Sequence, residues 1–433
     1  MTGPRLTSPA HRLPTFPWDS LEGAKARASA FPDGLVDLSI GTPVDDVPAS
    51  VQAALADAAA APGYPQTAGT PGLRSAIADF MRRRHGVPDA GAVVPVVGTK
   101  EAIASLPMLL GVGEGHRVVV PELAYPTYEV AVRMAGATPV RADSLTQLGP
   151  TLPSSAPVLM FINSPGNPTG RILGEGHLRK VVQWARERGT VVVSDECYLG
   201  LAWDAEAPSI LDPAVNDGDL TGLIAVHSLS KTANMASYRA GWFAGDPELL
   251  GPLLQVRRHL GLMVPGPVQA AMVTALSDDD AHDRQRSRYA RRRSVLRNAV
   301  EAAGFRVDES YGGLYLWVTR GAGADAAGAA VGAGADAAGA ATGAGADAAG
   351  AATGAGTDAA GAATGAGTDA SGLAHADVAE VAETGRDLVD WFAERGILVA
   401  PGDFYGPKGA RHVRIALTAS DEAIEVTAGR IRG

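Results

Sequence analysis

Residues 228–242 read Ser-Leu-Ser-Lys-Thr-Ala-Asn-Met-Ala-Ser-Tyr-Arg-Ala-Gly-Trp, and this stretch places Lys231 among small hydroxylated residues. The apolar run at residues 223–226, just before it, predicts a buried strand. Arg239 follows the lysine by eight residues. A lysine on a short loop at the end of a buried strand loses its proton easily, because burial disfavours the ammonium form. We therefore expect a nucleophilic amine at Lys231.

A neutral lysine amine attacks aldehydes, and the usual biological aldehyde for it is pyridoxal phosphate. In that interpretation, Ser228 and Arg239 would bind the phosphate of the cofactor. A surface lysine on a polar loop would fit the same residues, since short motifs often match by chance. The rest of the chain decides between the two interpretations.

The composition indicates an acidic protein of enzyme size. The chain has 433 residues and a formal net charge of −10, which allows two or three domains and argues against nucleic acid as the main partner. Cys197 is the single cysteine, which excludes an internal disulfide and favours a reducing compartment. The sequence shows neither a signal-peptide pattern nor an apolar stretch of membrane-spanning length. We expect a cytoplasmic protein without a membrane partner.

The pattern of predicted elements divides the chain into three parts. Residues 1–33 are rich in proline and basic residues and predict an N-terminal arm. Residues 34–295 predict a large α/β domain, and residues 296–433 predict a smaller α+β domain. Within the last part, residues 321–372 repeat an Ala/Gly/Asp unit with a period of 11. Because almost nothing in these repeats can form a core, we expect a disordered surface insertion.

Polar residues follow the predicted strands of the large domain. Apolar strands without alternation, separated by helices, are typical of a parallel sheet covered on both faces. Ligands bind at the carboxyl edge of such sheets. Asp195 ends a valine-rich strand, and its burial would be costly without a cationic partner. The residues that we expect to line one pocket at this edge are Thr99, Tyr125, Asn167, Asp195, Tyr198 and Lys231.

Two glycine turns and one loop could contribute to this pocket. Gly41 ends a short strand and would let backbone approach a ligand, although an ordinary strand-ending turn is the more common case. Gly98 leads into a helix whose first N–H groups, at Thr99 and Lys100, would face an anion. Tyr64 lies on a loop rich in Gly and Pro, where it could donate to a ligand or serve as a partly buried aromatic.

The last predicted strand carries two candidate carboxylate ligands. Either Arg411 or Arg414 could bind a carboxylate bidentately through its guanidinium. A surface arginine on an edge strand is the alternative for each. The residues alone leave this choice open.

Four linked motifs resemble the fold-type I, class I and II aminotransferases that depend on pyridoxal phosphate. They are Ser-Pro-Gly-Asn167-Pro-Thr-Gly, Asp195-Glu-Cys-Tyr198, Ser228-Leu-Ser-Lys231 with Arg239, and Val-Arg414-Ile-Ala. The successive steps from Asn167 to Asp195, Tyr198, Lys231 and Arg239 are 28, 3, 33 and 8 residues, which match that family in order and approximate spacing. The resemblance covers most of the chain apart from residues 321–372.

The resemblance implies an α/β fold with a mostly parallel central sheet flanked by helices, and a role for each site residue. Lys231 would form the Schiff base and move protons, and Asp195 would hold the pyridinium. Asn167 and Tyr198 would contact the ring oxygen, and Tyr125 would stack on the ring. The implied phosphate ligands are Gly98, Thr99, Lys100, Ser228, Arg239 and, from the neighbouring subunit of a homodimer, Tyr64. Gly41 and Arg414 would bind the substrate carboxylate, and no metal is expected.

Residues 40–48, 121–128 and 401–407 are similar to actinobacterial N-succinyldiaminopimelate aminotransferases. This similarity implies N-succinyl-LL-2,6-diaminopimelate:2-oxoglutarate aminotransfer in lysine biosynthesis, with glutamate as the amino donor. The alternatives are an aspartate-, alanine- or aromatic-type aminotransferase, or a β-lyase on the same fold. A non-catalytic cofactor-sensing domain of a transcriptional regulator is more remote. It would need a DNA-binding module, whereas about 33 residues precede the predicted fold.

Overall fold

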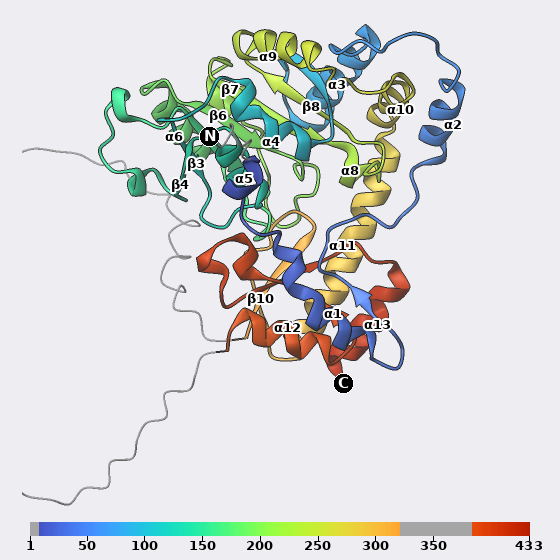
Figure 1. Cartoon of the computed structure of the whole chain (residues 1–433). Helices are drawn as coiled ribbons and strands as arrows, with labels where there is room; N and C mark the ends of the chain where they lie inside the picture. The colour runs from blue at the N-terminus through green and yellow to red at the C-terminus, as the bar shows by residue number, and fades with distance from the viewer. Residues whose placement is uncertain (1–7, 321–382) are drawn as a thin grey trace, which may run out of the picture. The chain divides into compact units, whose positions relative to one another are not determined.

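Seven strands form the sheet on which the expected pocket depends (Figure 1). In spatial order they are β2 (Ala92–Val97), β8 (Ala240–Gly245), β7 (Leu223–Ser228), β6 (Val191–Asp195), β5 (Leu159–Asn163), β3 (Arg117–Val120) and β4 (Thr138–Arg141). β8 runs antiparallel to both of its neighbours, and the other described pairs in this sheet are parallel. The expectation of a mostly parallel central sheet is confirmed.

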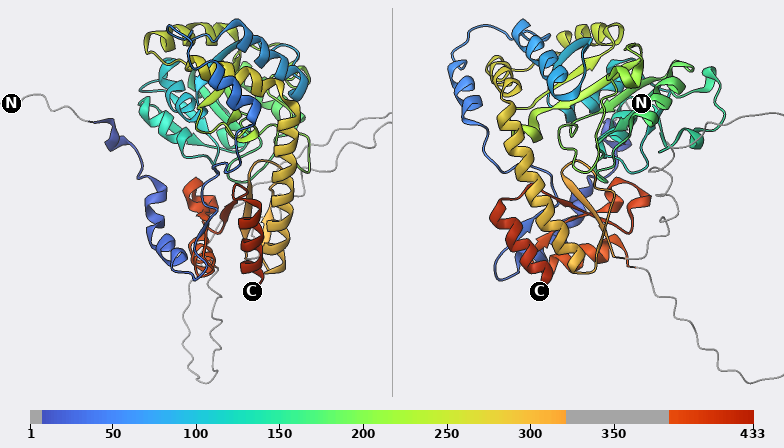
Figure 2. Two further views of the ribbon diagram at one scale, coloured as in Figure 1. Left: turned by 90° about the vertical axis from the view of Figure 1, so that its right-hand side faces the viewer. Right: turned by 180° about the vertical axis from the view of Figure 1, so that it is seen from behind.

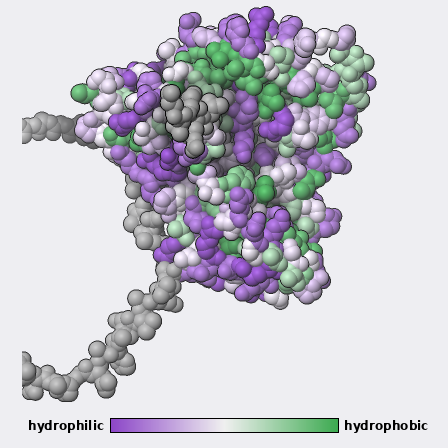
Figure 3. Space-filling view, in the orientation of Figure 1, coloured by the Kyte–Doolittle hydropathy of each residue, from purple (hydrophilic) through white to green (hydrophobic). Residues whose placement is uncertain are grey.

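The structure is a computed structural model that describes residues 8–320 and 383–433. The insertion that we expect at residues 321–372 therefore lies outside the described residues. None of the described helices is long and apolar enough to cross a membrane. The face seen in Figure 3 mixes hydrophilic and hydrophobic residues.

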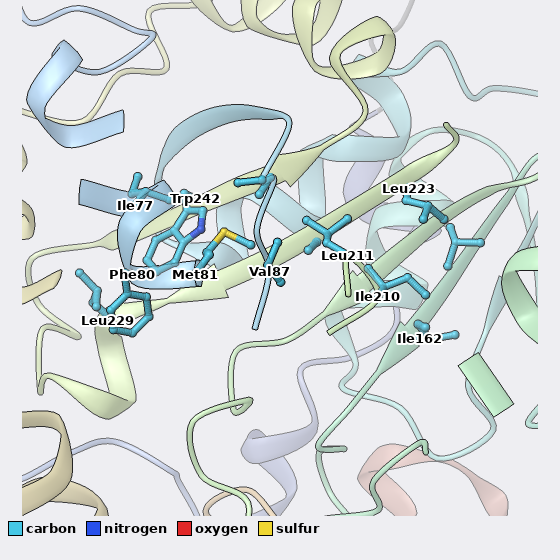
Figure 4. Close-up of a cluster of buried hydrophobic side chains, with 14 of the residues drawn as sticks. Ile77, Phe80, Met81, Val87, Ile162, Ile210, Leu211, Leu223, Leu229 and Trp242 are labelled. Carbon is cyan, nitrogen blue, oxygen red and sulfur yellow. The ribbon is translucent and has the colours of Figure 1, made fainter. Parts of the chain in front are cut away.

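Helices cover both faces of the seven-stranded sheet. One face packs against α3 (Pro71–His85), α6 (Glu175–Arg186) and α10 (Gly266–Ser277), and the other against α4 (Thr99–Leu109), α5 (Thr127–Met134) and α9 (Pro247–His259). Successive side chains of a strand point to opposite faces. Trp242 therefore packs in the first cluster, part of which is shown in Figure 4, and Phe243 packs in the second.

Local sequence signals fix the ends of these helices. The Thr70 hydroxyl accepts a hydrogen bond from the Leu73 N–H at 3.1 Å, and Pro71 occupies the first position of α3. The same helix ends at Gly86, whose φ of 65° lies in the left-handed region that favours glycine. The other helices of this part are α2 (Ala49–Asp57), α7 (Pro213–Asn216) and α8 (Leu229–Thr232).

A second sheet has the order β12 (Ala400–Pro401), β13 (Val413–Ala416), β10 (Tyr315–Thr319) and β9 (Arg306–Asp308), and all its pairs are antiparallel. Its cluster of buried apolar side chains includes residues of α1 (Glu22–Ser29), α12 (Gly385–Ala393) and α13 (Asp421–Arg432). A short parallel pair joins β1 (Val36–Asp37) to β11 (Ile397–Leu398).

Helix α11 (Asp279–Ala302) connects the two sheets along the chain and lies beside α13 (Figures 1 and 2). Its residues Tyr289 and Leu296 belong to the apolar cluster of the second sheet. The boundary that we expect between residues 295 and 296 therefore falls inside a continuous helix.

Candidate active site

The carboxyl ends of three neighbouring strands carry the first expected residues. Asn163 at the end of β5 lies level with Asp195 at the end of β6, which in turn lies level with Val226 of β7. Strand β7 then leads through Ser228 into α8, the short helix that holds Lys231. Because parallel strands end at the same edge of a sheet, the structure places these residues on one side of the fold.

Asp195 is a buried carboxylate that faces hydrogen-bond donors. It is 5% exposed. One of its oxygens accepts a hydrogen bond from the Tyr128 phenol at 2.7 Å, and the other accepts from the Cys197 backbone N–H at 3.1 Å. Burial raises the pKa of Asp195, and these hydrogen bonds offset only part of that rise. No cation contributes to this balance among the described residues, so a protonated pyridine nitrogen would supply the missing partner.

The bond from Tyr128 was not expected from the sequence. Tyr128 is fully buried on α5 and stacks on Phe161, with ring centroids 5.1 Å apart. A tyrosine within a helix reads as ordinary core in a single sequence. The sequence offers no clear signal for its role, since Tyr128 belongs to the first turn of α5 and Tyr125 lies just before that helix.

Lys231 is half-buried, and its amine donates a hydrogen bond to the Gly41 carbonyl. Burial lowers the pKa of Lys231, and the charges of Arg414 and Arg239 lower it further, against an opposing effect of Tyr315 and Cys197. A lowered pKa extends the range of pH in which the amine is neutral. The direction agrees with the expectation from the sequence.

Gly98 and Arg239 meet at the edge of the sheet. Gly98 has a φ of 79° and precedes α4, and a Cβ at this position would overlap the Arg239 guanidinium. The strand registers place Ser228 level with Gly241, and Gly241 level with Val96. The N-terminus of α4, the Ser228 turn and Arg239 therefore lie together, as an anion site requires.

The side chains of two expected phosphate ligands, Lys100 and Tyr64, do not point towards the expected phosphate site. Lys100 is exposed, and its ammonium lies 5.8 Å from the centroid of the Phe16 ring, so its side chain is directed towards the N-terminal arm. Tyr64 is 98% exposed. The structure of a single chain thus does not bring the Tyr64 side chain into the pocket, and a role at the phosphate would need a second copy.

Tyr125 lies at the rim of the same pocket. It is half-buried and packs edge-on against Tyr128, with ring centroids 6.2 Å apart. Burial raises the pKa of Tyr125, and Asp195 and Arg414 are close enough to act on its charge. An aromatic ring between these two groups is suitably placed to cover a flat ligand.

Arg414 is the arginine that reaches the pocket. It is 2% exposed on β13 and donates hydrogen bonds to Asn167 Oδ1 at 2.9 Å and to the Ser39 carbonyl at 2.6 Å. Its guanidinium carbon lies 3.9 Å from the centroid of the Tyr315 ring. The described residues give this guanidinium no carboxylate partner. Arg411, the alternative, is half-buried, and its carbonyl accepts a hydrogen bond from Thr319.

Tyr198 and Gly41, two further expected site residues, both lie against Tyr315. Tyr198 is 7% exposed, and its hydroxyl lies 3.2 Å from that of Tyr315. A Cβ at residue 41 would overlap the Tyr315 hydroxyl, so only glycine fits there. Tyr315 is the second residue that the sequence did not single out, because strand β10 reads as plain core.

These groups fit pyridoxal phosphate on chemical grounds. A buried acid without a cation suits the pyridine nitrogen, and an amine with a lowered pKa suits the aldehyde. The N-terminus of α4 with Arg239 suits a phosphate. A separate cavity of about 130 Å3 is lined in part by Gly166 and Thr169 of the loop that holds Asn167. That cavity is mainly apolar and contains neither Lys231 nor Asp195.

The chain matches known proteins over nearly its whole length. The family model described as "Aminotransferase class I and II" matches residues 33–431. A Mycobacterium tuberculosis protein, named as a probable aminotransferase, is 53% identical over 422 residues, covering 97% of this chain and 85% of that protein. The 4-dedimethylamino-4-oxo-anhydrotetracycline transaminase of Streptomyces rimosus is 48% identical over 421 residues, covering 97% of this chain and 99% of its own length.

A more distant relative and a solved structure also match most of the chain. The LL-diaminopimelate aminotransferase of Desulforudis audaxviator is 33% identical over 334 residues, covering 73% of this chain and 84% of that protein. The solved structure of an aminotransferase from Neisseria meningitidis has a TM-score of 0.77 at 24% identity, and covers 98% of this chain and 99% of its own. The expected fold class, that of the fold-type I transferases, is confirmed.

Replacing Tyr128 by Phe removes one donor from the buried carboxylate of Asp195. Without that bond, we expect the affinity of the cofactor-free chain for pyridoxal phosphate to fall about tenfold or more, since hydrogen bonds to charged groups are the strong ones. The measurement is a fluorescence titration of the chain with pyridoxal phosphate. Tyr311→Phe, at an exposed tyrosine, is the matched control. Equal affinities for Tyr128→Phe and the parent would show that Tyr128 does not support Asp195.

Proposed function

The chain belongs to the class I and II aminotransferase family, which depends on pyridoxal phosphate, and from this premise we propose that it catalyses N-succinyl-LL-2,6-diaminopimelate:2-oxoglutarate aminotransfer. In this proposal, glutamate is the amino donor in the biosynthetic direction. The family establishes the transaminase activity and the cofactor. The donor and the acceptor are the proposed part.

The arrangement of Lys231, Asp195 and Arg414 carries the proposal. Arg414, a buried guanidinium without an acid among the described residues, acts on the charge of Lys231, and Asp195 and Arg414 both act on Tyr125, so the three groups are near one another. An amino acid and pyridoxal phosphate would supply a partner for each group: an aldehyde for the amine, a pyridinium for the carboxylate and a carboxylate for the guanidinium. Arg414 suits the substrate α-carboxylate, because its planar guanidinium can bind a carboxylate through two parallel hydrogen bonds.

The cofactor, when bound, supplies an aldehyde for the Lys231 amine and a ring that accepts the electron pair from the Cα–H bond of the substrate. Arg414 binds the carboxylate and thereby orients Cα towards Lys231. The Lys231 amine then removes the proton from Cα, and its lowered pKa favours this step because it enlarges the neutral share of the amine. Asp195 keeps a proton on the pyridine nitrogen through its buried negative charge.

The remaining residues position the ring. Asn167 accepts the hydrogen bond of Arg414 through its Oδ1, so its Nδ2 is free to donate to the ring oxygen together with Tyr198. Tyr125 covers the ring. The proposed phosphate ligands are Gly98, Thr99, Ser228, Arg239 and, through its backbone N–H, Lys100. In this proposal the Gly41 N–H lies close to the substrate carboxylate.

We further propose that the enzyme works as a homodimer in the cytoplasm. A tyrosine that is 98% exposed, Tyr64, is an unusual surface residue unless a second chain covers it. In the proposed dimer, Tyr64 contacts the phosphate in the neighbouring subunit. The lone Cys197 supports a reducing compartment.

The names of some relatives support the diaminopimelate part of the proposed substrate, but not its succinyl group. Several are named LL-diaminopimelate aminotransferases, which favours a diaminopimelate-type substrate. The succinyl group rests on the similarity of residues 40–48, 121–128 and 401–407. A second candidate is the amination of an oxo group on a polycyclic compound, which the 48% identity to the Streptomyces rimosus transaminase favours.

Replacing Lys231 by Ala should abolish the half-reaction with glutamate. We expect the absorption band of the bound cofactor to change on addition of glutamate to the parent and to return with an oxo acid. The variant should react at least about a hundredfold more slowly, since its general base is lost. Lys180→Ala, at an exposed lysine on α6, is the control. Turnover by Lys231→Ala at the parent rate would refute the mechanism.

A panel of amino acceptors tests the substrate. With glutamate as donor, kcat/KM should be highest for the oxo acid of N-succinyldiaminopimelate. The competitors are oxaloacetate, pyruvate, an arylpyruvate and a polycyclic ketone. Faster turnover of any competitor would replace the proposed substrate with that compound while leaving the aminotransferase mechanism in place.

A further inference from the structure

Tyr315 lies among the groups of the proposed active site. It is 4% exposed on β10, and its ring lies beneath the Arg414 guanidinium at 3.9 Å. Its hydroxyl is 3.2 Å from the hydroxyl of Tyr198. The two tyrosines come from different sheets, since Tyr198 follows β6 and Tyr315 begins β10.

Gly41 links Tyr315 to Lys231. The Tyr315 hydroxyl lies so close to Gly41 that any Cβ at residue 41 would overlap it. The Gly41 carbonyl accepts the hydrogen bond of the Lys231 amine. Tyr315 therefore lies between Lys231, on the other side of Gly41, and Tyr198, and both of these groups act on the pKa of Tyr315.

The titratable groups that interact electrostatically with Tyr315 come from several elements. They are Arg414 from β13, Lys231 from α8, Tyr198 and Cys197 from the turn after β6, Tyr289 from α11, Tyr125 beside α5, and Tyr405 from the short helix Gly402–Tyr405. The positive charges in this set are those of Arg414 and Lys231. Both stabilise negative charge on the Tyr315 oxygen.

The two hydroxyls have unequal acidity. Burial raises the pKa of Tyr198 well above its usual value, and the neighbouring Tyr315 raises it further. Burial also acts to raise the pKa of Tyr315, but the charges of Arg414 and Lys231 act against it, and the pKa of Tyr315 is lowered. A hydroxyl has one proton, so a Tyr198 that donates to the ring oxygen of the cofactor can only accept the hydrogen bond that it shares with Tyr315 at 3.2 Å.

We propose that Tyr315 is a positioning residue that donates its hydrogen bond to the Tyr198 oxygen and thereby directs the proton of Tyr198 to the ring oxygen of the cofactor. This inference rests on the proposed function. A donor to the ring oxygen draws negative charge from it and weakens its hold on the proton of the neighbouring Lys231 nitrogen. Tyr315 thus lowers the pH at which that nitrogen loses its proton.

The test is a spectroscopic pH titration of the cofactor bound to the holoenzyme. We expect Tyr315→Phe to raise the midpoint by roughly half a pH unit to one pH unit, which is the shift expected from the loss of one hydrogen bond. Tyr405→Phe is the matched control. Tyr405 is also buried and faces Arg414 at 5.0 Å, but its hydroxyl has no hydrogen-bond partner within the described residues. Its variant should leave the midpoint in place.

A double-mutant cycle separates this role from a general loss of packing. If Tyr315 acts through Tyr198, adding Tyr315→Phe to Tyr198→Phe should move the midpoint no further. The KM for glutamate should also be unchanged in Tyr315→Phe, because the phenyl ring beneath Arg414 is kept.

Three results would overturn this inference and leave the proposed function in place. They are an unmoved or lowered midpoint in Tyr315→Phe, an equal shift in Tyr405→Phe, and additive shifts in the cycle. A parent protein that binds no pyridoxal phosphate at Lys231 would overturn the proposed function, and this inference with it.

Discussion

Two buried charges that do not meet govern this structure. Within the described residues, the Asp195 carboxylate at the end of β6 has hydrogen-bond donors but no cation, and the Arg414 guanidinium on β13 has acceptors but no acid. A buried charge without a partner is costly, and each could be relieved by pairing with the other. The fold keeps them apart instead, with Asn167 bound to Arg414 and Tyr125 placed near both groups. A ligand with a cationic ring and a carboxylate satisfies both.

The separation follows from the two sheets. Parallel strands of the first sheet deliver Asp195, Ser228 and Lys231 to one edge, while the second sheet delivers Arg414 and Tyr315 from adjacent antiparallel strands. The hydrogen bond from Arg414 to Asn167 and the contact between Tyr198 and Tyr315 join the two sets. Catalytic geometry in this protein therefore depends on contacts between the sheets, so small changes at these contacts should alter proton positions before they alter stability.

Much of this site could be predicted from the sequence, because ligands bind at the carboxyl edge of parallel sheets and that rule selects Asp195, Asn167 and Lys231 directly. The choice of Arg414 over Arg411 came from the family resemblance alone, since strand alternation does not reveal which side chain reaches a loop of the other sheet. Tyr128 and Tyr315 were missed for a related reason. Their polar atoms act across tertiary contacts, whereas their local sequence is that of ordinary core. The position of Tyr64 depends on a second chain.

The most direct test of the account is chemical. Its central claim is that the buried amine of Lys231 bonds to pyridoxal phosphate while Asp195 pairs with the ring. Reduction of the holoenzyme with borohydride, followed by digestion and mass spectrometry, locates that bond. The account predicts that the cofactor mass is found on the peptide containing Lys231. Its absence from that peptide, or its presence on another lysine such as Lys100, would contradict the account.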